Sequence, residues 1–241
     1  MGSLIGMGLP VVLVHGVRTS RTMWRQQLEA LDRAGRTAVA LDLPGHGERL
    51  GETFTVDGAV QAISDSVEGV GGRALVVGLS LGGYTAIAHA ARHPEQVAGL
   101  VAAGCSTRPM RVLVEPWRWA VRGIARLPDR GAGLNQRMAD LFLPAAGAAD
   151  VGAGGYALHV MEDVLREVGR LSPTADLRVI ECPVWLVNGR YDHFRGEERR
   201  FLASARDGRL VVVPGATHLV SLVRPERFVR VVLEALDELE G

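Results

Sequence analysis

Short apolar runs alternate along the chain with longer stretches in which apolar residues recur at helical spacing. A run that is apolar throughout and ends in glycine or polar residues at both sides is typical of a strand in a parallel sheet, because both faces of such a sheet are covered. The pattern therefore predicts a series of buried parallel strands. These strands are expected at residues 10–14, 37–41, 74–77, 97–102, 183–188 and 209–213.

The stretches between these runs carry the spacing of amphipathic helices. Trp24, Leu28 and Leu31 recur at helical spacing within residues 24–34, and further helices are expected at 56–67, 84–91 and from Pro225 onward. Strands that alternate with helices in this way build a mostly parallel, doubly wound sheet with helices on both faces. The sequence thus predicts an α/β fold with a sheet of about six strands.

The alternation stops between residues 106 and 174 and resumes at residue 175. We interpret residues 106–174 as a helical insertion, so residues 1–105 and 175–241 together form the core domain. The insertion carries several large apolar side chains, which form either its own core or the lining of a pocket. These side chains are Trp117, Trp119, Phe142, Tyr156 and Met161.

The strand at residues 74–77 runs into Gly78-Leu79-Ser80-Leu81-Gly82, and a segment rich in small residues follows. Strand, Gly-x-Ser-x-Gly and helix is the order of a nucleophile elbow, in which a tight turn lifts the serine hydroxyl above the sheet edge. The same turn aims backbone N–H groups and a helix N-terminus at one point. A motif this short also arises by chance, so an inert serine in a glycine-rich turn is the alternative.

Two further polar residues follow strands later in the chain. Asp192 comes just after the strand at 183–188, and His218 comes just after the strand at 209–213. Functional groups of such sheets gather at the carboxyl ends of the strands. A serine becomes nucleophilic when a histidine takes its proton and a carboxylate orients that histidine. The order Ser80, Asp192, His218 therefore predicts a catalytic triad.

At this point the sequence resembles the α/β-hydrolase superfamily over nearly its whole length. The segments that carry the resemblance are Leu13-Val14-His15-Gly16, Trp24, Asp42-Leu43-Pro44-Gly45-His46-Gly47, Gly78 to Gly83, Asn188-Gly189-Arg190-Tyr191-Asp192 and Gly215-Ala216-Thr217-His218. They look like the branch of esterases, lactonases and C–C hydrolases that carries a helical cap.

The resemblance implies a role for each matching residue. Ser80 would be the nucleophile, His218 the general base and then acid, and Asp192 its orienting carboxylate. The backbone N–H groups of Val17 and Leu81 would form the oxyanion hole. Substrate-binding residues are expected in the cap, at Trp117, Phe142, Tyr156 and Met161.

Two departures from the family pattern refine this expectation. The family usually opens with an antiparallel hairpin, and the few residues before the first strand leave room for a vestige at Leu4-Ile5 at most. The nucleophile position holds Ser80 instead of an aspartate, which argues against haloalkane dehalogenase and epoxide hydrolase chemistry. Among the remaining histidines, we expect His15 to pack under the oxyanion loop and His193 to be a bystander beside Asp192.

The expected activity is hydrolysis of a small or medium carboxylic ester through an acyl-enzyme on Ser80. The same triad would also serve C–C bond or lactone hydrolysis, or a lyase reaction without an acyl-enzyme, and the sequence does not separate these. A ligand receptor that uses the pocket without catalysis is an alternative from another class, since a fold alone does not fix function.

The charge balance of the sequence limits the kinds of binding partner that we expect. The 241 residues include 27 basic and 27 acidic side chains without a run of like charge, which argues against a nucleic-acid or anionic membrane surface. All the basic residues are arginines, so lysine Schiff-base chemistry is excluded. We expect a small-molecule substrate and a monomer or homodimer.

Cofactors and compartment follow from a few further features. Cys105 and Cys182 lie far apart without a CxxC pattern, which favours two reduced thiols over a disulfide or a metal site. Neither metal-ligand spacing nor a dinucleotide fingerprint is recognisable, so no cofactor or metal is expected. The N-terminal residues lack the features of a signal peptide, and we expect a cytoplasmic protein.

Overall fold

The computed structural model describes residues 8–109, 129 and 131–241. Its centre is a six-stranded sheet in the order β2-β1-β3-β4-β5-β6, and every neighbouring pair is parallel. The strands are β1 (Val11–Val14), β2 (Ala38–Leu41), β3 (Ala74–Leu79), β4 (Val97–Ala103), β5 (Val184–Gly189) and β6 (Gly208–Val213). The predicted doubly wound sheet of six strands is confirmed, and it is parallel throughout.

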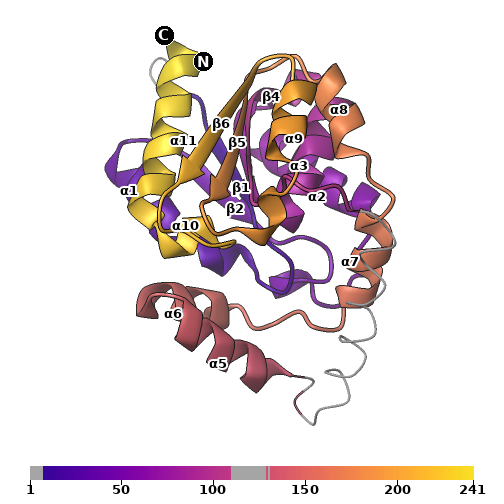
Figure 1. The fold of residues 1–241 in the computed structure, drawn as a ribbon, viewed down its shortest axis with the longest axis vertical. Helices are drawn as coiled ribbons and strands as arrows, with labels where there is room; N and C mark the ends of the chain where they lie inside the picture. Colours follow the sequence, from indigo (N-terminus) through magenta and orange to yellow (C-terminus); the bar gives the residue numbers. More distant parts are fainter. Residues whose placement is uncertain (1–7, 110–128, 130) are drawn as a thin grey trace, which may run out of the picture.

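Helices cover both faces of the sheet (Figure 1). One face carries α1 (Arg25–Arg33), α10 (Val220–Val223) and α11 (Pro225–Glu240), and the other carries α2 (Val56–Gly69), α3 (Leu81–Arg92), α8 (Pro173–Val179) and α9 (Glu198–Ser204). Short 3-10 turns occur at Arg21–Trp24, Gly47–Arg49, Pro94–Gln96 and His193–Arg195.

Alternate side chains of each strand enter two separate cores. In β1, Val12 and Val14 join the core beneath α2 and α3, whereas Val11 and Leu13 join the core beneath α1 and α11. All four are fully buried, as the uninterrupted apolar run predicts for a strand covered on both faces. This packing fixes the sheet and hence the positions of the loops at its carboxyl edge.

Three described helices stand between β4 and α8, where the sequence predicts an insertion. They are α5 (Ala132–Phe142), α6 (Ala145–Ala153) and α7 (Met161–Val168). The helices α5 and α6 lie beyond the carboxyl ends of the strands (Figure 1), and we call these two helices the cap. The predicted features at Leu4-Ile5, Trp117 and Trp119 lie outside the described residues.

One buried carboxylate ties the cap to the core. Asp150 of α6 accepts hydrogen bonds from Arg25 Nε at 2.6 Å and from Gln26 Nε2 at 3.0 Å. Its backbone carbonyl accepts a further bond from Thr22 Oγ1 at 2.6 Å. These contacts hold α6 against the start of α1. Over the described part of the chain, no helix combines the length and the apolar character needed to cross a bilayer.

Candidate active site

Ser80 sits at the turn between β3 and α3 in a strained backbone conformation. Its φ of 56° and ψ of −114° are unusual for a residue with a side chain. The Ser80 N–H donates to Ala103 O at 2.8 Å, and the Ser80 carbonyl accepts from Tyr84 N–H at 3.0 Å. The turn is therefore held from both sides, as a nucleophile elbow requires.

The two flanking glycines are needed because backbone passes close to both. A Cβ on Gly78 would lie 2.2 Å from Gly82 O, and a Cβ on Gly82 would lie 2.2 Å from Val14 O. Real Cβ atoms essentially never come that close to another heavy atom. The spacing of glycines around Ser80 thus follows from the close approach of α3 to β1 and β3.

The structure brings the three predicted triad residues together. Ser80 Oγ lies 3.0 Å from His218 Nε2, and His218 Nδ1 lies 3.1 Å from Asp192 Oδ1. The Asp192 side chain is fully buried, whereas the His218 side chain is 20% exposed. Both distances fall within hydrogen-bond reach, so His218 can take the proton of Ser80 while Asp192 holds the ring.

The surroundings of the Asp192 carboxyl favour its ionised form. Burial raises the pKa of its carboxyl, but the hydrogen bond and charge of His218, with the Phe194 N–H, outweigh burial and leave that pKa below its ordinary value. Phe194 N–H donates to Asp192 Oδ1 at 2.8 Å. Asp192 Oδ2 is buried and has no hydrogen-bond partner among the described residues.

Glycine also makes room for the imidazole ring. Gly104, directly after β4, has a φ of 60°, and a Cβ there would lie 3.2 Å from the His218 ring. The rings of His193 and Phe194 flank His218, with centroids at 5.1 Å and 4.7 Å. These neighbours leave little freedom for the His218 ring to turn away from Ser80.

The two residues expected to supply the oxyanion hole come from different segments of the chain. Leu81 is the first residue of α3, and Val17 lies in the loop after β1 and lines the same cavity as Ser80. The carbonyl of Gly16, the residue before Val17, accepts hydrogen bonds from Thr19 Oγ1 at 2.9 Å and from His15 Nδ1 at 2.7 Å. His15 Nε2 in turn accepts the Leu43 N–H at 3.0 Å, so His15 lies under this loop as expected.

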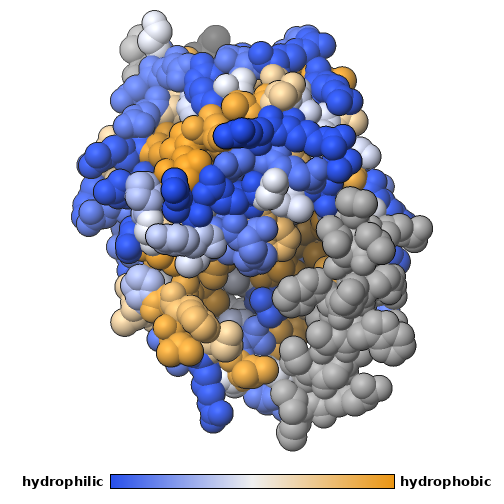
Figure 2. Space-filling view, in the orientation of Figure 1, coloured by the Kyte–Doolittle hydropathy of each residue, from blue (hydrophilic) through white to orange (hydrophobic). Residues whose placement is uncertain are grey.

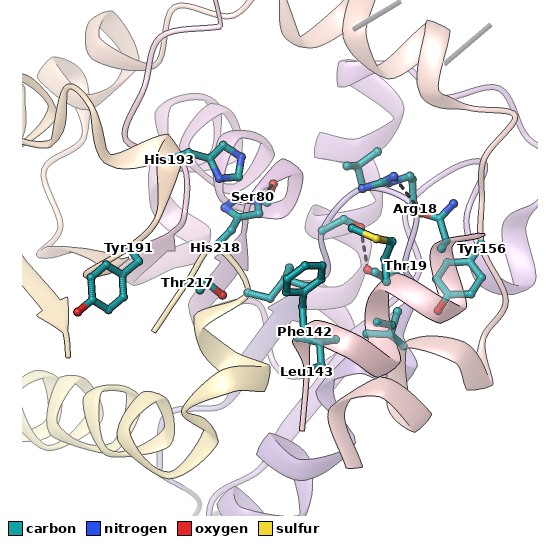
Figure 3. A pocket seen from close by; sticks show the side chains of 17 residues that line it. Arg18, Thr19, Ser80, Phe142, Leu143, Tyr156, Tyr191, His193, Thr217 and His218 are labelled. Carbon is teal, nitrogen blue, oxygen red and sulfur yellow. Dashed lines mark hydrogen bonds between the residues drawn. The ribbon is translucent and has the colours of Figure 1, made fainter. Parts of the chain in front are cut away.

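A cavity of about 560 Å³ lies between the cap and the carboxyl edge of the sheet. On the face drawn in Figure 2, apolar residues gather around the hollow between the cap and the core. Ser80 and His218 open into this cavity together with side chains from α5 (Figure 3). Its size is in the range of sites for small molecules.

The expected substrate-binding residues divide into three cases. Phe142 and Tyr156 line the cavity. Met161, by contrast, is the first residue of α7 and is buried without lining the cavity, because the chain has left the cavity wall after Tyr156. Trp117 lies outside the described residues.

Other residues of the cavity wall were not predicted from the sequence to line a pocket. They come from the loop after β1, from α5 and α6, and from the loops after β5 and β6: Arg18, Thr19, Asn135, Met138, Ala139, Leu143, Val151, Tyr191, His193, Thr217 and Leu219. His193, expected to be a bystander, is therefore part of this wall. Burial and the charge of His218 lower the pKa of His193, which Asp192 partly opposes.

The arrangement brings a serine hydroxyl, an imidazole and a carboxylate together at one cavity. Within residues 8–109, 129 and 131–241, no three His, Cys, Asp or Glu side chains are grouped as metal ligands. The side chains present are therefore suited to covalent catalysis by a serine, in which an acyl group passes to Ser80 and then to water.

Comparison with known sequences identifies proteins that are related to this chain. The sequence profile of the Alpha/beta hydrolase family matches residues 11–231. The chain is 30% identical over 250 residues to a pimeloyl-[acyl-carrier protein] methyl ester esterase of Chromobacterium violaceum, which covers 97% of this chain and 96% of the relative.

Solved structures show the same fold. The chain is similar to a thermophilic esterase from Thermogutta terrifontis, with a TM-score of 0.80 and 24% identity over 98% of this chain and 92% of that one. It is also similar to the enol-lactonase from Burkholderia xenovorans, with a TM-score of 0.77 and 20% identity over 98% and 94% of the two chains.

Proposed function

The chain belongs to the alpha/beta hydrolase family, and we propose that it is a serine hydrolase that cleaves a small or medium carboxylic ester through an acyl-enzyme on Ser80. The observation that carries this proposal is the continuous chain of short contacts from Ser80 through His218 to Asp192. The esterase activity in the names of the relatives supports it.

In the first half of the reaction, Ser80 Oγ attacks the ester carbonyl while His218 Nε2 accepts its proton. The carbonyl oxygen becomes an oxyanion, which the N–H groups of Val17 and Leu81 stabilise. One such donor is typically worth about 3 kcal/mol in the transition state. The tetrahedral intermediate then collapses, and the alcohol leaves with the proton held by His218.

In the second half, water replaces the alcohol. His218 removes a proton from this water, which attacks the acyl-Ser80 carbonyl and passes through a second oxyanion in the same place. Collapse releases the carboxylic acid and returns the proton to Ser80 Oγ. Asp192 stays ionised throughout and stabilises the imidazolium form of His218. No cofactor takes part in these steps.

Lactone hydrolysis is a second candidate, favoured by the likeness to the enol-lactonase. A lactone is an internal ester, so the same attack and collapse apply and the alcohol stays attached to the acyl group. C–C bond hydrolysis or a lyase reaction would use the same triad on another bond. A receptor that binds a ligand without catalysis would not need the contact between Ser80 and His218.

Further parts of the proposal concern the setting of the enzyme. We propose that the insertion at residues 106–174, which includes the cap, covers the active site and that the substrate is a small molecule. A monomer or homodimer in the cytoplasm, without nucleic-acid or membrane partners, is consistent with the balanced charge of the sequence.

The test is hydrolysis of p-nitrophenyl acetate and butyrate by the wild type, Ser80→Ala and Ser172→Ala. Ser172 is exposed and lies outside the cavity, so its variant controls for the loss of a hydroxyl. We expect Ser80→Ala to lose at least about four orders of magnitude in kcat and Ser172→Ala to match the wild type. Full activity in a folded Ser80→Ala protein would refute the proposal.

A further inference from the structure

Arg18 introduces a positive charge into the wall of the cavity. It follows Val17 in the loop after β1, and its side chain is exposed within the cavity. In Figure 3, Arg18 and Tyr156 lie on one side of the cavity and Ser80 and His218 on the other, with Phe142 between them in this view. The charge therefore lies in the wall of the same cavity as Ser80.

Among the described residues, this cation has a polar neighbour but no acidic one. Its Nη1 donates to Asn135 Oδ1 of α5 at 2.9 Å. None of the described residues that line the cavity is Asp or Glu, and no ion pair joins Arg18 to a carboxylate in the described part of the chain. Other arginines are paired, such as Arg21 with Asp42 and Arg25 with Asp150.

The surroundings of Arg18 favour an anion beside it. Arg18 is exposed, but nearby protein atoms partly desolvate its guanidinium and lower the pKa of Arg18 from its ordinary value, which Tyr156 partly opposes. An arginine nevertheless stays protonated in a protein. A partly desolvated cation gains from an opposite charge beside it, and an anionic ligand in the cavity would supply that charge.

The backbone at Arg18 is strained as well. Its φ is 67°, and Ser80 is the other described residue with a side chain that has a positive φ. The Arg18 carbonyl accepts the Ala157 N–H at 3.2 Å, which helps to hold this conformation. Such strain persists where the surrounding structure imposes it and is concentrated at functional sites. Both strained residues line the same cavity.

We infer that Arg18 binds the free carboxylate of an ester substrate, so that the preferred substrates are monoesters of small dicarboxylic acids. This inference rests on the proposed ester hydrolysis at Ser80. A guanidinium presents its N–H donors in a planar fork that matches a carboxylate. The apolar side chains of Met138, Phe142 and Leu143 complete a wall suited to the methylene groups that join the two ends of such a substrate.

Arg18 could instead serve only to hold α5 through Asn135. The two roles predict different substrate dependence. A structural role alters the cavity for every substrate alike, whereas a carboxylate-binding role alters the preference for a charged substrate over a neutral one of the same length. The decisive quantity is therefore a ratio of kcat/KM values.

The experiment measures kcat/KM for monoethyl glutarate and for diethyl glutarate with the wild type, Arg18→Gln and Arg18→Lys. Arg33→Gln is the matched control, because Arg33 is exposed and lies away from the cavity. We expect the ratio of monoester to diester to fall roughly 10- to 100-fold in Arg18→Gln and to stay at the wild-type value in Arg33→Gln.

Arg18→Lys keeps the charge without the planar fork and should give an intermediate ratio. If Arg18→Gln does not fold, the ratio measured for Arg18→Lys decides the test. A ratio that stays at the wild-type value in folded Arg18→Gln and Arg18→Lys would overturn the inference.

Calorimetric binding to the Ser80→Ala protein separates this inference from the proposed function, because no turnover is needed. We expect monoethyl glutarate to bind at least about 10-fold more weakly when Arg18→Gln is added. Equal binding would refute the carboxylate site even if Ser80-dependent hydrolysis is shown. Conversely, hydrolysis that survives in Ser80→Ala would refute the proposed function while the binding result still decides the role of Arg18.

Discussion

At the scale of single residues, the imidazole of His15 connects the oxyanion loop to the loop after β2. Its Nδ1–H donates to Gly16 O, and its Nε2 accepts the Leu43 N–H. Only the neutral ring with the proton on Nδ1 can make both bonds. Burial lowers the pKa of His15 to about 4, against smaller opposing effects of Gly16 and Asp42.

This pKa predicts how stability depends on pH. Between pH 6.5 and about 4, the unfolded chain protonates His15 and the folded chain does not, so the free energy of unfolding falls as pH falls through this window. One such imidazole contributes a slope of up to about 1.4 kcal/mol per pH unit. Urea unfolding at several pH values should show a shallower slope for His15→Asn than for the wild type, and parallel slopes would contradict the prediction.

At the scale of elements, the nucleophile elbow depends on the close approach of α3 to β1. The atoms that a Cβ on Gly82 would meet belong to the backbone of Val14 and His15, so no side-chain rotation relieves the clash. At Gly69, in the last turn of α2, a Cβ would meet open space. These two glycines make a matched pair for substitution.

We predict that Gly82→Ala lowers the free energy of unfolding by about 3 kcal/mol or more, because α3 must move off β1. Gly69→Ala should be neutral or stabilise by up to about 1 kcal/mol, since alanine restricts the unfolded chain and favours the helix. Denaturant unfolding of both variants measures the difference. Equal stabilities would show that the elbow does not need this close approach.

The elements also show which strands and helices can be predicted from sequence patterns. All six strands could be predicted because residues such as Val11 to Val14 are buried on both faces and therefore uniformly apolar. The helix after Ser80 begins at Leu81, earlier than the predicted Tyr84, because the elbow geometry imposes helix on the poor helix formers Gly82 and Gly83. The helices α8, α9 and α10 were not predicted. Each is too short for a repeating pattern of apolar residues to be recognised in the sequence.

Some residues of the candidate site could likewise be predicted from the sequence, and others could not. Ser80, Asp192 and His218 could be found because each lies within a few residues of a strand end, in an order typical of one mechanism. Arg18 could not, because its place in the cavity depends on a left-handed backbone and on Asn135, which lies far along the chain. Periodicity likewise does not say which apolar side chains of an insertion face a pocket, as Phe142 and Met161 illustrate.

At the scale of the whole molecule, the cavity is built by the core and by the cap together. The core carries Ser80 and His218, and α5 of the cap carries Ala139, which is buried and lines the same cavity. The length of the acyl chain that fits should therefore depend on the cap.

We predict that Ala139→Phe shifts the preference toward short acyl chains, because the added ring takes up cavity volume. The ratio of kcat/KM for p-nitrophenyl octanoate over acetate should fall about 10-fold or more. Ala149→Phe is the control, since Ala149 is an exposed residue of α6 outside the cavity. The same ratio in both variants would mean that α5 does not bound the acyl site.

The most direct test of the central claim, that Ser80 is an activated nucleophile, is mass spectrometry after exposure to a fluorophosphonate probe. We predict a single adduct on Ser80 in the wild type and a labelling rate at least about 1,000-fold lower in His218→Gln, because the proton of Ser80 then has no acceptor. No adduct on the folded protein, an adduct on another residue, or equal labelling of both proteins would contradict the account.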